Sequence, residues 1–255
     1  MTIKAQDVKE LREKTGLGMM ECKKALEEAN GNLEEAIKNL RKSSALKAEK
    51  KASRTAIEGI ITSKISNKEI TFVEVNCETD FVAKDENFIN FCEEALKVAV
   101  DTSSEENLLD EVSERMEKQR MALVQKIGEN IIIRKVKKIT GEVLESYIHS
   151  NKKIAAGVSL DQGSPEIAKE VAMHIAASNP IVLSPEDLDE SYINSEREIF
   201  RSQVEKENKP EEIKEKMIQG KLNKQLADVS LLKQPFVKDP SKSVEAFLSE
   251  SNTKI

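Results

Sequence analysis

Ile70-Thr71-Phe72-Val73-Glu74-Val75 is the stretch that decides how this chain folds. Its β-branched and aromatic residues favour a strand. Further on, apolar residues recur at the three- and four-residue spacing of a helix, at Phe88, Phe91, Cys92, Ala95, Leu96 and Ala99. The intervening segment Thr79–Asp85 is therefore expected at a strand-to-helix turn, where a short loop holds side chains outward on a rigid base.

Asp80 and Phe81 lie in this turn, and two interpretations of them are open. In the first, Asp80 caps the following helix and Phe81 packs against it as a hydrophobic staple. In the second, both side chains are presented to a partner. Spacing alone does not separate the two.

The composition suits a helix-rich soluble protein with modest cores, because charged residues make up 34% of the 255 residues and aromatic residues only 4%. No apolar run approaches the roughly 20 residues that cross a bilayer, and the first residues lack the apolar segment of a signal peptide. The three cysteines, an odd number without paired spacing, indicate reduced thiols and a cytoplasmic location. The net charge of −6 argues against nucleic acid as the main partner.

Residues 1–42 are expected to form three short helices. The second should stop at Asn30-Gly31, and Asn32 should cap the third. This pattern resembles a ubiquitin-associated-type three-helix domain. A basic helical linker is expected over residues 43–55, where a single acid, Glu49, faces a group of cations. Clustered cations bind phosphates, but no aromatic residues for base stacking are interleaved, so a solvated spacer is favoured over nucleic-acid binding.

The remaining chain is expected to form an α+β core with antiparallel sheets. An αββα-like order appears twice, which predicts two similar halves. The first half covers residues 56–140, and the second covers 141–183 and 227–255. Residues 184–226 are charge-dense and are expected to form an inserted antiparallel helical hairpin, with a thin apolar seam at Tyr192, Ile199, Ile213 and Met217.

Motifs for covalent chemistry are missing from the sequence. The close pair Gly16 and Gly18 opens no phosphate-binding loop, so we expect no bound nucleotide. His149 and His174 stand apart from any Cys or His at metal-ligand spacing, so we expect no metal and no cofactor. No nucleophile lies beside a plausible base, so an enzyme is not expected.

Two motifs resemble those of the bacterial elongation factor Ts family. One is Glu74-Val75-Asn76-Cys77-Glu78-Thr79-Asp80-Phe81-Val82-Ala83-Lys84, and the other is Thr15-Gly16-Leu17-Gly18-Met19-Met20-Glu21-Cys22-Lys23-Lys24-Ala25-Leu26. The similarity extends to Lys126–Asn130 and to His149. It implies a guanine-nucleotide exchange factor that binds elongation factor Tu with GDP, displaces Mg²⁺ and promotes GDP release so that GTP rebinds.

The resemblance also implies particular site residues. Phe81 would enter an apolar slot of the GTPase with Thr79, Asp80 and Val82 around it, which dislodges the Mg²⁺ that holds GDP. Other contacts with elongation factor Tu would come from Met19, Met20, Lys23, Lys51, Ile127, Gly128 and His149. The basic linker would lie against an acidic face of the GTPase rather than in solvent. The partner would be this GTPase, with no direct nucleic acid and no membrane, in a possible homodimer or 2:2 complex. The alternative function is an adaptor or ribosome-associated module built on the three-helix domain and the basic linker.

Overall fold

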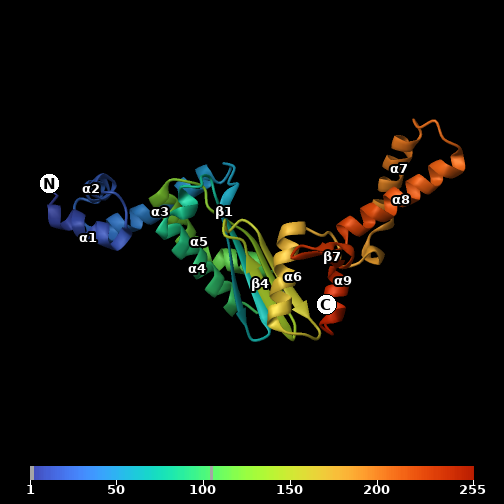
Figure 1. Cartoon of the computed structure of the whole chain (residues 1–255). Coiled ribbons are helices and arrows are strands. Elements are labelled where there is room, and N and C mark those ends of the chain that lie inside the picture. The colour runs from blue at the N-terminus through green and yellow to red at the C-terminus, as the bar shows by residue number, and fades with distance from the viewer. Residues whose placement is uncertain (1–2, 104–105) are drawn as a thin grey trace. The chain divides into compact units, whose positions relative to one another are not determined.

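The computed structural model describes residues 3–103 and 106–255 and has the expected α+β architecture (Figure 1). The chain forms two compact units, which are described separately below. The first comprises the residues up to Ser66, Ile70–Lys138 and Ser150–Ile154, and the remainder forms the second. Residues 1–2 of the expected 1–42 domain, and residues 104–105 of the expected 56–140 half, lie outside the described residues. Over the described ranges, no helix has the length and apolar character needed to cross a bilayer.

The first unit begins with the helices α1 (Ala5–Thr15), α2 (Met19–Glu28) and α3 (Leu33–Lys51). Asn32 caps α3 as expected, because its Oδ1 accepts a hydrogen bond of 3.1 Å from the Glu35 N–H. The three helices enclose a small apolar cluster made of Val8, Leu11, Leu17, Cys22, Ala25, Leu26, Ala29, Ala36 and Leu40.

α3 is longer than the three-helix pattern predicts and runs through the position where the linker was expected to begin. Its second half packs on α5 (Leu108–Ile127), with Ser44 and Ala48 buried. These two small residues lie one helical turn apart on the same face, so they let the helices approach closely. The basic segment is therefore a packed helix up to Lys51 rather than a solvated spacer.

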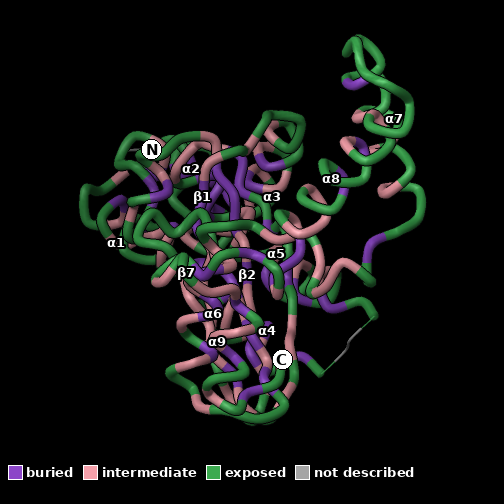
Figure 2. The backbone as a smooth tube through the Cα atoms, turned by 45° about the vertical axis from the view of Figure 1, so that its right-hand side comes forward, coloured by how far each residue is buried: buried purple, intermediate pink, exposed green. Residues whose placement is uncertain are grey.

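A three-stranded sheet forms the centre of the first unit. Its strands β1 (Glu58–Ser66), β2 (Glu69–Cys77) and β3 (Ile132–Thr140) lie in the order β1-β2-β3. The helix α4 (Glu86–Asp101) packs on β1 and on α5. The middle strand β2 is mostly buried, as its purple path in Figure 2 shows. Because β2 is buried in the middle of the sheet, its sequence is rich in the apolar and β-branched residues that predict a strand.

The second unit is built on β4 (Val143–Ile148) and β5 (Ala155–Leu160), which pair antiparallel with Val143 opposite Leu160. α6 (Pro165–Ser178) packs on both strands and is capped by Ser164, whose side chain accepts from the Ile167 N–H. The core also includes Phe236 and Leu248, from a second antiparallel pair and the final helix. These elements are β6 (Pro235–Phe236), β7 (Asp239–Ser243) and α9 (Val244–Glu250), with the 3₁₀ turns η2 (Pro185–Asp187) and η3 (Leu231–Lys233) before them.

The two halves share only part of their order. Each has a strand pair followed by a helix, β1-β2-α4 and β4-β5-α6. The first then adds β3 to its sheet, whereas the second has a separate two-stranded sheet. That second sheet was missed because β6 has only two residues and contains a proline.

An antiparallel helical hairpin is present, formed by α7 (Glu190–Val204) and α8 (Glu211–Val229), side by side in Figure 1. The predicted seam is wrong in its details. Ile199 and Ile213 are exposed, and the buried positions are Val204, Ile218 and Leu222. Ile218 and Leu222 lie one turn apart on α8, so they form the inward stripe.

Candidate partner-binding site

Phe81 lies on the surface of the loop between β2 and α4. Its side chain is 82% exposed, just before the 3₁₀ turn η1 (Val82–Lys84), whose Ala83 is buried. Asp85, not Asp80, caps α4, because its Oδ1 accepts a hydrogen bond of 2.8 Å from the Asn87 N–H. The cap-and-staple interpretation is therefore wrong for this pair of residues. The turn instead holds a large apolar side chain in solvent.

Glu129 fastens this loop from the segment that follows α5. Its Oε2 accepts hydrogen bonds of 3.0 Å from the N–H groups of Glu78 and Thr79. Its Oε1 accepts a third, of 2.7 Å, from the Thr79 hydroxyl. In return, the Asn130 N–H donates to Oε1 of Glu78 at 2.6 Å. These charge-assisted bonds fix the residues immediately before Asp80 and Phe81.

Asp80 pairs with a cation inside the same turn. Lys84 Nζ lies 2.8 Å from Oδ2 of Asp80, and both side chains are exposed. The hydrogen bond and the charge of Lys84 lower the pKa of Asp80 below its ordinary value. Asp80 is therefore ionised on the surface next to Phe81.

The segment Gln125–Asn130, here called the junction, contacts the surrounding elements of the first unit. Gln125 Nε2 donates to Oε1 of Glu21 in α2 at 2.9 Å. Lys126 Nζ donates to Oδ1 of Asn87 in α4 at 2.6 Å. A Cβ at Gly16 would lie 3.2 Å from this same Nζ, so the α1–α2 turn approaches Lys126 closely.

Two further contacts join α3 and the residues after it to the junction. Lys51 Nζ donates to the carbonyl oxygen of Gly128. Gly128 ends α5 with φ of 89°, a left-handed conformation that glycine adopts without strain. Asn130 is buried, and its Nδ2 donates to the Arg54 carbonyl at 2.8 Å. The junction thus connects both family-like motifs to the end of one helix.

The amino-terminal motif presents a second apolar patch in the first turn of α2. Met19 and Met20 are 61% and 74% exposed. Lys23 follows one turn later. Its side chain is exposed, and its Nζ lies 3.8 Å from Oε1 of Glu27. Exposed neighbouring methionines are well suited to contact with a partner because their side chains are flexible and polarizable.

The other expected site residues differ in their surroundings. Ile127 is partly buried against the core, and Lys51 donates to the Gly128 carbonyl, so each of these side chains is only partly exposed. His149 is exposed in the second unit, with its ring 6.5 Å from that of Tyr147. The structure thus brings Thr79, Lys51, Ile127 and Gly128 together around the junction, while His149 belongs to the other unit.

Sequence reasoning missed the anchoring role of Glu129. It identified Lys126–Asn130 only as a segment similar to a contact region. The available signal was the placement of an acid directly after the helix-ending Gly128. Nothing in the sequence shows that this acid reaches a loop about 50 positions away, as the hydrogen bond to Thr79 does.

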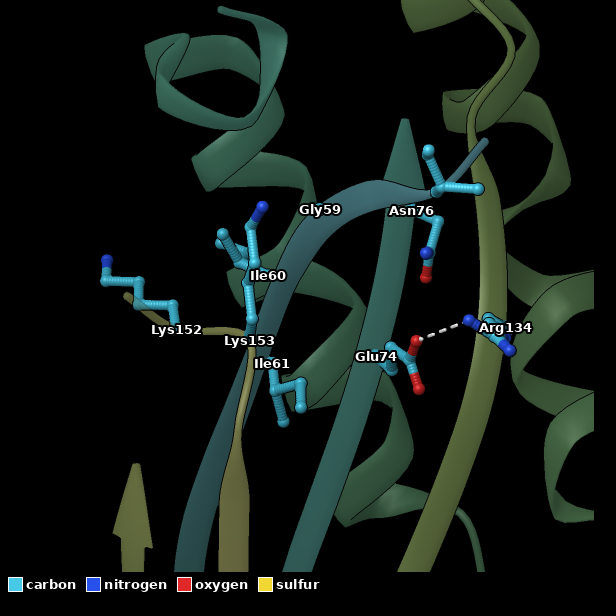
Figure 3. A pocket seen from close by; sticks show the side chains of 9 residues that line it. Gly59, Ile60, Ile61, Glu74, Asn76, Arg134, Lys152 and Lys153 are labelled. Carbon is cyan, nitrogen blue, oxygen red and sulfur yellow. Dashed lines mark hydrogen bonds and ion pairs between the residues drawn. The ribbon is translucent and has the colours of Figure 1, made fainter. Parts of the chain in front are cut away.

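A separate shallow cavity of about 170 Å³ lies at the sheet, lined by β1, β2, β3 and the 152–153 segment (Figure 3). Glu74 Oε1 lies 3.2 Å from Nη1 of Arg134 within it. Lys153 Nζ lies 2.5 Å from Oε2 of Glu58. These ion pairs engage Glu74, Arg134 and Lys153 of the lining. The lining residues are Ile57, Gly59, Ile60, Ile61, Glu74, Asn76, Arg134, Lys152 and Lys153.

The cysteines are free and buried. Burial raises the pKa of the Cys77 thiol to about 12, and the negative charge of Glu129 is the second cause of this rise. Burial also raises the pKa of the Cys92 thiol. Both are therefore neutral, unreactive thiols at neutral pH. In the part of the chain that the structure describes, no group of three or more His, Cys, Asp or Glu side chains could hold a metal ion.

The sequence pattern of the family described as Elongation factor TS matches residues 78–255. An Elongation factor Ts of Marinobacter nauticus is 52% identical over 244 residues, which are 95% of this chain and 84% of the relative. One from Hahella chejuensis is 48% identical over 255 residues, which are 99% of this chain and 89% of the relative. One from Teredinibacter turnerae is 49% identical over 260 residues, which cover 100% of this chain and 88% of the relative.

Proposed function

The chain belongs to the elongation factor Ts family, and from this premise we propose that it is a guanine-nucleotide exchange factor for elongation factor Tu. It would act in translation elongation by binding elongation factor Tu with GDP, displacing Mg²⁺ and releasing GDP so that GTP rebinds. The observation that carries the proposal is the 82% exposure of Phe81 on an anchored turn. Such exposure leaves a large apolar side chain available to a partner.

An exchange factor needs no covalent chemistry of its own. It binds the nucleotide-free GTPase more tightly than the nucleotide-bound one, and linkage then weakens nucleotide binding by the same factor. Burial of one exposed Phe is worth about 1.5–3 kcal/mol. Since about 1.4 kcal/mol is tenfold in affinity, Phe81 alone could weaken GDP binding by tenfold or more. We therefore assign Phe81 the role of a wedge.

Thr79, Asp80 and Val82 complete this wedge in the proposal. Thr79 is fixed by Glu129, and Asp80 supplies an ionised carboxylate on the surface beside Phe81. Displacement of a cation that bridges phosphate oxygens removes a large favourable electrostatic interaction with GDP. In this proposal the wedge acts through the Mg²⁺ ion. Its displacement releases the nucleotide without contact between the wedge and GDP.

The helix α2 and its surroundings would bind elongation factor Tu without taking part in the displacement of Mg²⁺. Met19 and Met20 offer exposed apolar surface, and Lys23 a nearby cation. We propose that they bind elongation factor Tu together with Lys51 and the junction residues Ile127 and Gly128, and that the hydrogen bond from Lys51 to the Gly128 carbonyl orients this surface. His149 would contribute from the second unit. We also propose that the chain acts in the cytoplasm, as a homodimer or in a 2:2 complex with elongation factor Tu.

Release of labelled GDP tests the function directly. Elongation factor Tu from the same source is loaded with fluorescent GDP and mixed with excess unlabelled GDP, with and without this chain. The release rate should rise with the concentration of the chain and then saturate. An unchanged rate with correctly folded chain would overturn the proposal.

The adaptor or ribosome-associated alternative depends on a free basic segment. Lys47 lies 2.5 Å from Glu21, and Lys51 is bound to Gly128, which reduces that basic surface. An RNA complex should lose about 0.7–0.9 log units of affinity per phosphate contact for each log unit of salt. A complex held by Phe81 should depend on salt far less. A salt titration of partner binding separates the two.

A further inference from the structure

We infer that Glu129 is a positioning residue for nucleotide exchange, because it holds the loop that carries Phe81 in the orientation the GTPase requires. The inference rests on the proposed function and adds a residue to it. Glu129 itself need not touch the partner. It acts through Thr79, which is bound at both its backbone N–H and its hydroxyl.

The hydrogen bonds to Glu129 converge on one side chain. A carboxylate accepts through two oxygens, and here Oε2 takes two backbone N–H groups while Oε1 takes the Thr79 hydroxyl. The Thr79 hydroxyl oxygen in turn accepts from the Val82 N–H at 3.4 Å. The chain on either side of Asp80 and Phe81 is thereby tied to one carboxylate.

Packing supports the turn after Phe81, where Ala83 is buried in the core, but not Phe81 itself. Its side chain is exposed and so receives little support from packing. The surface pair of Asp80 with Lys84 lies within the same turn, and such pairs contribute little. Glu129 links the residues just before Asp80 and Phe81 to the segment after α5, whereas η1, just after them, packs on β1 and α4. Without Glu129, Thr79 loses its three-point attachment to that segment, and the direction of Phe81 is less firmly fixed.

Loss of this link should affect the rate of exchange more than docking. The methionines of α2 still bind the partner when the loop is free, so the half-saturating concentration depends mainly on them. The wedge contributes only as the nucleotide leaves, so misplacing it lowers the maximal rate. A misplacement of about 1 Å can cost as much as 10²-fold in rate.

The test uses three variants of the full chain. Glu129→Ala removes both acceptor oxygens and with them all three hydrogen bonds, and Glu129→Gln keeps one carbonyl oxygen but replaces the other oxygen with a donor. Glu93→Ala is the matched control, since it removes an exposed carboxylate from α4 and leaves the loop bonds intact. For each variant, GDP release is measured against factor concentration, chemical denaturation gives stability, and hydrogen exchange gives the protection of the Thr79 amide.

Glu129→Ala should lower the maximal GDP-release rate about tenfold, with the half-saturating concentration changed less than about twofold. Glu129→Gln should fall between Glu129→Ala and the wild type, and Glu93→Ala should match the wild type. The Thr79 amide should exchange faster in both Glu129 variants while global stability is largely kept. If Glu129→Ala fails to fold, the Gln variant carries the comparison.

Two results would overturn the inference. One is a wild-type maximal rate in a folded Glu129 variant whose Thr79 amide exchanges quickly. The other is a raised half-saturating concentration at an unchanged maximal rate, which would make Glu129 a docking residue. An inactive wild-type chain would instead overturn the proposed function, so the two failures are distinguishable.

Discussion

Phe81 and Phe88 lie on opposite sides of the boundary between surface and core, although only the η1 turn and the start of α4 separate them. Phe81 is 82% exposed, whereas Phe88 is 0% exposed and belongs to the core beneath the sheet. The same residue type therefore serves two physical purposes within a short stretch. Phe88 stabilises the fold, and Phe81 remains available to a partner.

Phe81→Ala should leave the free energy of unfolding nearly unchanged, because the ring is in solvent in the free protein. The GDP-release rate should fall about tenfold or more, for a loss of about 1.4–3 kcal/mol of differential binding. Denaturant unfolding and GDP release from elongation factor Tu at fixed free Mg²⁺ measure the two quantities. Phe88→Ala is the control and should cost about 3–5 kcal/mol of stability. Native exchange by Phe81→Ala would show that this ring is not the wedge.

Asp80→Ala should also slow exchange without destabilising the fold, because Asp80 does not cap α4. Asp85 does, so Asp85→Ala should cost about 1 kcal/mol of stability. Chemical denaturation of the two variants, beside GDP release, separates a surface role from a capping role. A loss of stability in Asp80→Ala as large as in Asp85→Ala would contradict this assignment.

Met19→Ser combined with Met20→Ser should raise the half-saturating concentration of the factor and leave the maximal release rate nearly unchanged. Both side chains are exposed, so the fold should be kept. Removal of residues 1–42 is a poorer test, because the cut falls inside α3 and removes the first half of a helix whose second half packs on α5. A GDP-release titration gives both parameters. An unchanged half-saturating concentration would remove this pair from the interface.

Local signals predicted most elements of the fold. The β2 run and the Asn32 cap depend on neighbours in the sequence, and each is present in the structure. The length of α3 was missed because its last turns are stabilised by packing on α5, which no local pattern reveals. The hairpin seam was misplaced for a similar reason, since the partner helix selects which apolar stripe is buried.

The sequence predicted where the candidate site lies in the chain, but not how its side chains are arranged in space. The expected strand-to-helix turn located Phe81, yet spacing could not decide between a staple and a wedge. That decision depends on the exposure of the ring. The anchoring by Glu129 and the contact of Lys126 with Asn87 join residues that are distant in sequence. Only the tertiary structure shows that one junction supports both motifs.

Replacement of residues 184–226 by a short Gly-Ser link should preserve most exchange activity. The hairpin is fastened by a thin seam of Val204, Ile218 and Leu222, and most of its surface is exposed in Figure 2. Its exposed Ile199 and Ile213 offer a contact surface, so self-association is the property expected to change. GDP release and sedimentation of the deletion variant are the measurements. A folded deletion without exchange activity would place the hairpin in the exchange machinery.

His174 should make the second unit less stable in acid. Its Nδ1 accepts a hydrogen bond of 3.2 Å from the Val237 N–H, so Nε2 carries the proton and lies 2.9 Å from Oε1 of Gln234. Burial lowers the pKa of His174 below 6.5, and the hydrogen bond to Gln234 opposes this only in part. The unfolded chain therefore binds a proton at a pH where the folded chain does not.

This stabilising contribution is complete above the unfolded pKa of about 6.5 and is lost as the pH falls through and below that value. Each unit by which folding lowers the pKa corresponds to about 1.4 kcal/mol. Denaturant unfolding of the wild type and of His174→Gln at pH 8 and at pH 5.5 measures the effect. Gln retains a donor and an acceptor but takes up no proton, so its stability should fall less between the two values. Equal losses in both proteins would show that the acid sensitivity arises elsewhere.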